Sequence, residues 1–221
     1  NTKAFTAAAL GMLVEEDRIA WDTRVVDVLP WFRMSDPFVT AELTIRDLLV
    51  HNSGLGLGAG DLLWWPASTY TRDEIARRLR FLPLESSFRS AYAYDNVLYL
   101  IAGEVIEELS GETWERFIET RILDRIGMDD SDPNHSGAAH GGNVAVTHAR
   151  VEGTVRPIAP FTSDNTNPAG GIMSSATDMA KWMIVQLDSG RVSATERLWE
   201  RSTQRLMWTI VTPIPTGTPA P

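Results

Sequence analysis

The sequence predicts a mostly helical chain with little β-strand and no strong domain boundary inside it. Between residues 97 and 109 the apolar side chains recur at helical spacing, and Gly111 follows as a helix-ending residue. Residues 4–16 are apolar on nearly every face, which is typical of a helix that is buried all round. A strand pair is indicated at Glu152-Gly153, which has the composition of a tight hairpin turn between short apolar segments.

Capping patterns and apolar spacing extend this helical interpretation to most of the chain. In a capping box, a Ser or Thr is followed three residues later by an acidic residue or Gln, as at Thr44 and at Thr71. Four glycines between residues 54 and 60 predict a flexible or tightly turning loop. Five further helices are expected, at 45–50, 71–80, 113–123, 179–187 and 193–208.

Composition and charge exclude several classes of function. The chain has 221 residues with 20 Lys+Arg and 29 Asp+Glu, so its formal net charge is −9 and no basic excess is present for nucleic-acid phosphates. Cysteine is absent, which excludes disulfides, thiolate catalysis and Cys-based zinc sites. No apolar run reaches the length of roughly 18 residues that a membrane span needs. Neither a nucleic-acid partner nor a cofactor is expected.

Both ends of the sequence look cut. The chain opens directly into an apolar stretch without a signal peptide. Residues 213–221 are rich in Pro and contain a Gly, which disfavours helix and interior strand and suits either a disordered tail or a linker to a further part. We therefore expect one partial domain at 1–212 and a Pro-rich linker at 213–221.

Two short patterns carry candidate chemistry. Lys3 stands at the start of a helix that otherwise favours burial, and a buried lysine can lose its proton and act as a base. Alternatively, it is a terminal lysine in water. Tyr94 and Asn96 lie two residues apart just before a helix, so a phenol and an amide can be presented together. The other interpretation is a core tyrosine beside a helix cap.

Taken in order, these patterns resemble the serine β-lactamase and penicillin-binding protein family, most closely its class C β-lactamase-like hydrolases and esterases. Lys3 matches the last residue of the family's S-x-x-K motif, and Tyr94 and Asn96 match its Y-x-N motif. Three connecting segments agree, namely an LT-x-x-DLL-x-H-x-SGL stretch at 43–55, the helix after Y-x-N at 99–111, and a P-x-GG-x-x-S turn at 168–175. The resemblance covers essentially the whole chain.

The resemblance implies an α+β, β-lactamase/transpeptidase-like fold, of which this chain carries mainly the helical domain and lacks most of the antiparallel sheet. It places the nucleophilic serine immediately before Asn1, and the third family motif, an H/K-T/S-G strand, after residue 221. We therefore expect a fragment of a longer serine hydrolase that is inactive alone. The implied substrate is a small molecule or peptide (a β-lactam, a D-amino-acid peptide or a short ester), and the implied location is extracytoplasmic.

The resemblance also implies a role for each matched residue. Lys3 is expected to be the base, or the charge that tunes it, and Tyr94 to carry the proton between serine and leaving group. Their nitrogen and oxygen are expected within one hydrogen bond or one bridging water. Asn96 is expected to bind the substrate's acyl-side amide or Lys3. Asp95, where class C β-lactamases usually carry a small residue, caps the next helix or pairs with Lys3. Residues 64–66, Trp-Trp-Pro, either wall an acyl pocket or anchor a loop.

Two rival interpretations remain open. His135, His140 and His148 can be read as a metal site, although no H-E-x-x-H motif supports it and loop histidines are usually solvated. The chain can also be a non-catalytic relative that keeps the fold for binding or assembly. The residue before Asn1 distinguishes the enzyme from this non-catalytic relative. A serine there supports the enzyme, and any other residue supports the relative.

Overall fold

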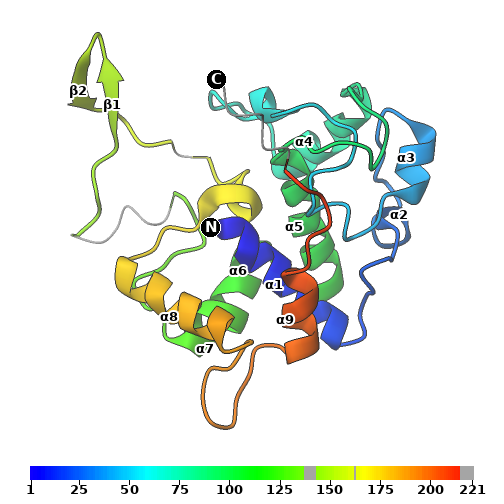
Figure 1. Ribbon diagram of the computed structural model, residues 1–221. Coiled ribbons are helices and arrows are strands. Elements are labelled where there is room, and N and C mark those ends of the chain that lie inside the picture. Colours follow the sequence, from blue (N-terminus) through cyan, green and yellow to red (C-terminus); the bar gives the residue numbers. More distant parts are fainter. Residues whose placement is uncertain (137–142, 162, 215–221) are drawn as a thin grey trace, which may run out of the picture.

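The computed structural model describes residues 1–136, 143–161 and 163–214 and builds them mainly from helices (Figure 1). The α-helices are α1 (Thr2–Glu15), α2 (Val25–Val28), α3 (Pro37–Glu42), α4 (Arg72–Arg78), α5 (Val97–Ser110), α6 (Trp114–Ile118), α7 (Asp124–Ile126), α8 (Ala176–Leu187) and α9 (Arg201–Met207). Short 3₁₀ segments lie at Asp61–Leu63 and Leu79–Phe81, and π-helical segments lie at Glu119–Leu123 and Asn167–Gly171. Among the described residues, the strands are β1 (His148–Val151) and β2 (Thr154–Pro157).

Helix α1 forms the centre of the helical body. It contacts α5, α6, α9 and the Asn167–Gly171 turn, which surround it in Figure 1. Phe5 is fully buried and stacks on Trp182 of α8 with ring centroids 3.9 Å apart. Burying one such side chain stabilises the fold by roughly 1.5–3 kcal/mol. The helix predicted at 4–16 is therefore confirmed, and its burial holds the Lys3 end in place.

The predicted hairpin forms where the turn residues indicated it. Strands β1 and β2 pair antiparallel with Val151 opposite Thr154. Glu152 and Gly153 both have positive φ, at 49° and 80°, which a tight turn of this hand requires. The hairpin projects away from the helical body (Figure 1). The expectation of a helix-rich chain with little sheet is thus confirmed for the described residues.

The helix predicted at 45–50 is wrong. The capping bonds do form, since Asp47 Oδ2 accepts from the Thr44 N–H at 2.9 Å. However, the segment is a series of turns that stops at His51, whose φ is +58°. A stretch this short gains few helical hydrogen bonds to offset the cost of nucleation. Asp47 also forms an ion pair with Arg89 at 2.6 Å, which ties the segment to a distant part of the chain.

The start predicted for the last helix, near Ser193, is also wrong. The Val192 and Ser193 N–H groups both donate to the Glu196 carbonyl, and a loop runs to residue 200 before α9 begins. This loop lets Trp199 reach the core, where it packs edge-on against Trp182 at 5.8 Å. Continuing the helix from Ser193 would give up that burial. Of the linker predicted at 213–221, residues 215–221 lie outside the described part of the chain.

Candidate active site

Lys3 lies where α1, the start of α5 and the Asn167–Gly171 turn meet. Its Nζ donates to Asn96 Oδ1 at 2.7 Å and to the Ala169 carbonyl at 2.9 Å. It also lies over two aromatic rings, 4.7 Å from the Tyr94 centroid and 5.0 Å from that of Tyr99. Burial lowers the pKa of Lys3 to about 8, and the negative charges of Asp95 and Asp61 only partly oppose this shift. At pH 7 roughly a tenth of the amine is then neutral, far more than for an ordinary lysine.

Asn96 is held on its other side by a carboxylate. Its Nδ2 donates to both carboxylate oxygens of Asp61 at 3.2 Å, which orients Oδ1 toward Lys3. Asp61 follows the Gly-rich loop, and Gly60 before it has a φ of +85° that favours glycine. Burial raises the pKa of Asp61, and the Asn96 hydrogen bond and the Lys3 charge partly oppose this. Lys3 and Asn96, both singled out from the sequence, are thus in direct contact.

Tyr94 approaches Lys3 with its ring face. Lys3 Nζ lies 4.7 Å from the centroid of this ring, so the two residues are neighbours in the site. Within the described residues, however, no hydrogen bond joins Lys3 Nζ to the phenol oxygen. Burial raises the pKa of Tyr94, and the negative charges of Asp61 and Asp95 raise it further. The phenol therefore holds its proton at neutral pH, and a neutral phenol can donate a proton.

Asp95 caps the helix that follows Y-x-N. Its Oδ1 accepts from the Leu98 N–H at 3.3 Å, as one of the two sequence-based interpretations expected. The residue is fully buried, and burial raises its pKa to about 7. The Asp95 N–H donates to His51 Nδ1 at 3.3 Å, and the His51 ring packs on Tyr94 with centroids 4.6 Å apart. Burial, aided by the Lys3 charge, lowers the pKa of His51 to about 4, so this ring is neutral.

The two tryptophans after the Gly-rich loop lie in different environments. Trp64 is 4% exposed and belongs to the core, which fits the packing-anchor interpretation for that residue. Trp65 is 63% exposed. The pair therefore does not form one continuous apolar wall.

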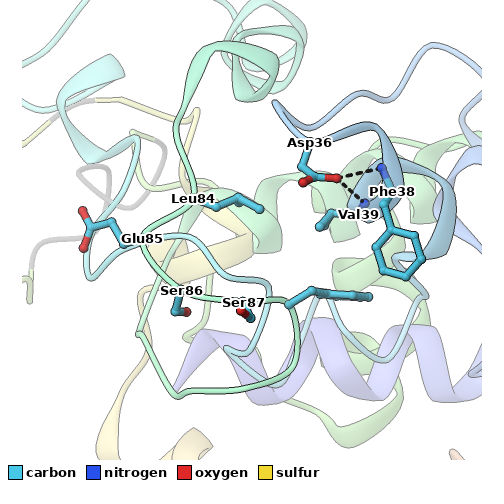
Figure 2. A pocket seen from close by; sticks show the side chains of 8 residues that line it. Asp36, Phe38, Val39, Leu84, Glu85, Ser86 and Ser87 are labelled. Atoms are coloured by element: carbon cyan, nitrogen blue, oxygen red, sulfur yellow. Dashed lines mark hydrogen bonds between the residues drawn. The ribbon is translucent and has the colours of Figure 1, made fainter.

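A surface cleft lies between α3 and residues 84–88 (Figure 2). Asp36, Phe38, Leu84 and Phe88 are among its lining residues, and Asp36 Oδ1 accepts from the Phe38 N–H at 2.7 Å as the cap of α3. Lys3, Tyr94 and Asn96 are not among the residues that line it. This cleft is therefore separate from the candidate active site.

The histidine-rich region does not assemble a metal site in the part of the chain that the structure describes. No group of three or more His, Asp or Glu side chains with metal-binding geometry occurs there. His148 Nδ1 pairs instead with the Val146 carbonyl at 2.7 Å. His140 lies outside the described residues.

The described helices include none that is long and apolar enough to cross a bilayer.

Three contributors to the site have no counterpart among the residues predicted from the sequence. The Ala169 carbonyl is a main-chain ligand, so its residue type carries no signal, although the P-x-GG turn that contains it was recognised. His51 lies in the recognised 43–55 stretch, but nothing in its spacing indicates a contact with Tyr94. Asp61 follows the fourth glycine of the Gly-rich loop, and only the fold brings it to Asn96.

Known proteins resemble this chain in sequence and in fold. A family model described as Beta-lactamase matches residues 1–218. The chain is 30% identical over 197 residues to the unguisins hydrolase ungD of Aspergillus violaceofuscus, covering 83% of this chain and 34% of that protein. It is 27% identical to penicillin-binding protein 4 of Amycolatopsis lactamdurans, covering 93% of this chain and 54% of the relative. A D-stereospecific amidohydrolase structure from Streptomyces sp. superposes with a TM-score of 0.77 at 22% identity, covering 94% of this chain and 63% of that one.

Proposed function

This chain belongs to the beta-lactamase family, and from that premise we propose that it is part of a class C β-lactamase-like serine hydrolase that works through an acyl-enzyme. The chain spans between about a third and a half of the length of the two curated relatives described above. The proposal therefore concerns the full-length protein. Its relatives include hydrolases, among them one described as a D-stereospecific amidohydrolase. A β-lactam, a D-amino-acid peptide or a short ester is the proposed substrate class.

One observation carries this proposal, namely the environment of the Lys3 amine. Its two hydrogen-bond partners, Asn96 Oδ1 and the Ala169 carbonyl, are neutral acceptors. A buried charged side chain is usually paired with a group of opposite charge, and neither acceptor of Lys3 carries one. Burial instead lowers the pKa of Lys3 to about 8, which suits a base that must be neutral to accept a proton.

The proposed nucleophile is a serine one helical turn before Lys3, at the position immediately preceding Asn1. Its oxygen attacks the substrate carbonyl carbon while its proton passes to the Lys3 nitrogen. The tetrahedral intermediate then expels the amine or alcohol, which takes a proton from the Tyr94 hydroxyl, and Tyr94 is reprotonated from Lys3. Water repeats the sequence on the acyl-enzyme and releases the acid.

Two further parts of the machinery are proposed to lie outside these residues. The family's oxyanion hole uses backbone N–H groups at the serine and at the third-motif strand, and each such donor is normally worth about 2.7–4 kcal/mol. The 221-residue chain alone is accordingly proposed not to form an acyl-enzyme. Within the chain, Asn96 is proposed to accept a hydrogen bond from Lys3. Its side-chain amide is also proposed to hydrogen-bond substrates that carry an acyl-side amide.

The alternative is a relative that binds ligands or assembles without catalysis. Such a protein has no requirement for a lysine with a lowered pKa between two neutral acceptors. The identity of the residue before Asn1 separates the two, since only the enzyme requires a serine there.

Covalent labelling of the full-length protein tests the proposal. A fluorophosphonate or penicillin-type probe should attach to the serine before Asn1, located by peptide mass spectrometry. Lys3→Ala should reduce the labelling rate by about 10²–10⁴-fold, because the hydroxyl loses its base. The chain's other lysine offers a matched control, and Lys181→Ala should label at the parent rate. Labelling at another residue, or parent-like labelling of Lys3→Ala, would contradict the proposal.

A further inference from the structure

The Asn167–Gly171 turn is bonded to the first two turns of α1. Thr6 Oγ1 donates to the Pro168 carbonyl at 2.7 Å, and Lys3 Nζ donates to the neighbouring Ala169 carbonyl at 2.9 Å. The Ile172 N–H completes the set by donating to Thr2 Oγ1 at 3.2 Å. Because Ala169 supplies a main-chain oxygen, its place relative to Lys3 is set by whatever holds this turn.

Asn167 holds the turn from inside the protein. It is fully buried, and its Nδ2 donates to Glu115 Oε1 at 2.8 Å. Its Oδ1 accepts from the His135 N–H at 3.3 Å. The side chain also fills the space beside Gly171, where an added Cβ would lie 2.2 Å from Asn167 Oδ1. The amide group is therefore bonded at both ends, and the turn has little freedom to move.

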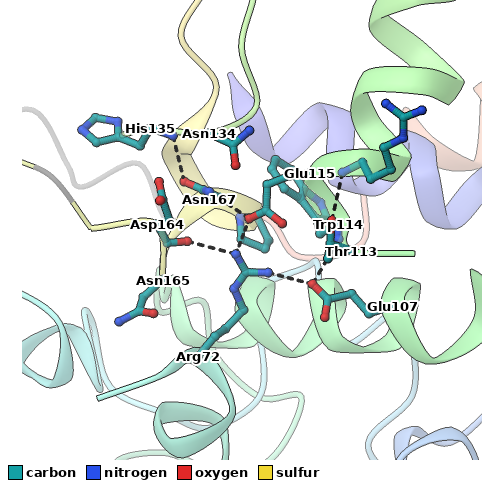
Figure 3. A network of polar contacts seen from close by, with 12 residues as sticks. Arg72, Glu107, Thr113, Trp114, Glu115, Asn134, His135, Asp164, Asn165 and Asn167 are labelled. Carbon is teal, nitrogen blue, oxygen red and sulfur yellow. Dashed lines mark hydrogen bonds and ion pairs between the residues drawn. The ribbon is translucent and has the colours of Figure 1, made fainter. Parts of the chain in front are cut away.

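Glu115 is held in turn by Arg72, the first residue of α4 (Figure 3). Arg72 Nη2 donates to Glu115 Oε1 and to the Asp164 carbonyl, the latter at 3.0 Å. Arg72 Nη1 donates to Glu107 Oε1 at 2.8 Å, so the guanidinium joins α4, α5 and α6. A planar guanidinium with several fixed donors gives this junction a defined geometry.

We propose that Arg72, Glu115 and Asn167 form a positioning chain that fixes the Ala169 carbonyl and thereby aims the Lys3 amine at the nucleophile. This inference rests on the proposed function. A neutral amine has two N–H donors and one lone pair. Asn96 Oδ1 and the Ala169 carbonyl engage both donors, so the lone pair takes the remaining tetrahedral direction. A displacement of about 1 Å in such a group can cost 10²-fold in rate.

The positioning role can be separated from electrostatics and from stability. The titratable groups that face Lys3 are Asp61, Asp95, His51, Tyr94 and Tyr99. None of these belongs to the chain from Arg72 to Asn167. Replacing the neutral Asn167 by Ala changes no net charge, so its effect on Lys3 is expected through the position of the turn that Asn167 holds.

The test is the pH dependence of probe labelling by the full-length protein, with thermal unfolding measured in parallel. We expect Asn167→Ala to lower the plateau rate by about 10–100-fold. We also expect the rising limb of the pH–rate profile for labelling to move to lower pH. The reason is that Lys3 loses its contact with the Ala169 carbonyl, an acceptor that favours the ammonium. Asn165→Ala is the matched control, since Asn165 Nδ2 donates to the Tyr70 carbonyl at 2.7 Å in the same segment. It should keep both the plateau and the limb.

If Asn167→Ala folds and the rising limb of its labelling profile lies at the same pH as in the parent, the inference is overturned, whatever the loss of stability. If that variant does not fold, Arg72→Lys keeps a cation but not the guanidinium fork, and the same displacement of the limb is expected. An unchanged limb in that variant overturns the positioning chain as well. Failure of the proposed function looks different, since Lys3→Ala would then label like the parent.

Discussion

The two lysines of this chain lie in opposite electrostatic environments. Lys3, at the start of α1, contacts two neutral oxygens, and burial lowers its pKa to about 8. Lys181, on α8, donates to the Asp178 carboxylate at 2.8 Å and to the Gly127 carbonyl, and the Asp178 hydrogen bond raises its pKa. The surroundings of Lys3 favour loss of its proton, whereas those of Lys181 favour the protonated form.

The difference between the two sites lies in the first acceptor. A carboxylate in contact offsets the charge of an ammonium, while an amide or carbonyl oxygen offers only a dipole. The carboxylates nearest to Lys3, Asp61 and Asp95, act at a distance, and their bonds go to Asn96 and to the Leu98 N–H. An ammonium in contact with a carboxylate retains its proton, whereas general-base catalysis needs an amine that can lose it.

Exchanging each lysine for arginine should break the comparison most sharply. Lys3→Arg keeps a positive charge but cannot release a proton, so probe labelling of the full-length protein should fall by about 10²–10⁴-fold. Lys181→Arg can still pair with Asp178 and should label at the parent rate. Parent-like labelling of Lys3→Arg would show that Lys3 supplies charge and not basicity.

Tyr94→Phe should have the next largest effect. It keeps the ring over which Lys3 lies and removes only the hydroxyl that is proposed to protonate the leaving group. We expect about a 10²-fold loss in turnover, with an unchanged thermal midpoint. The loss should shrink for esters with acidic leaving groups, which need no proton. An equal loss for every leaving group would contradict proton donation by Tyr94.

Much of the helical fold was predictable, because local patterns and tertiary packing agree there. The helix α5 follows from apolar spacing and from Gly111, whose φ is +76°. The errors come from segments in which distant contacts decide the conformation. Asp47 is bonded to Arg89, and the loop before α9 follows from the burial of Trp199.

In the candidate site too, residues in local motifs were predictable and contacts between distant segments were not. Lys3, Tyr94 and Asn96 were identified from motifs, and the fold brings them together. The Ala169 carbonyl and the Arg72–Glu115–Asn167 network were not identified. A main-chain ligand has no residue signature, and ion pairs between residues 43 positions apart, such as Arg72 and Glu115, leave no periodic pattern.

Asn96→Asp should convert the Lys3 site toward the Lys181 type. A carboxylate at the contact position favours the ammonium and should raise the pKa of Lys3 by about 1–3 units. The rising limb of labelling would then move to higher pH, and the rate near neutral pH would fall by about tenfold for each unit. Asn165→Asp adds the same charge elsewhere and serves as the control. A limb that stays in place would mean that Lys3 does not set it.

Asp178→Asn makes the reverse change at the other lysine. Burial alone would raise the pKa of Asp178, but hydrogen bonds from Lys181 and Ser131 outweigh it and hold that pKa below its usual value. The amide cannot accept all the bonds now made by Lys181, Ser131 and the Asp130 N–H. We expect a loss of about 1–3 kcal/mol in the free energy of unfolding, measured with urea, and no change in the labelling limb. A displaced limb would contradict the independence of the two sites.

The smallest expected effect is a difference in how stability depends on alkaline pH. Because the folded-state pKa of Lys3 is about 8, below the ordinary value of 10.5, the unfolded chain binds more protons between these two values. Lys3 therefore makes stability rise as pH increases through that window. The pKa of Lys181 is raised, so its contribution is complete below 10.5 and is lost above it. Urea unfolding from about pH 7 to 10 should show a less positive slope in Lys3→Met than in the parent, while Lys181→Met should keep the parent's slope below pH 10. A Lys3→Met slope equal to the parent's would mean that Lys3 titrates like a solvated lysine, and the contrast between the two sites would disappear.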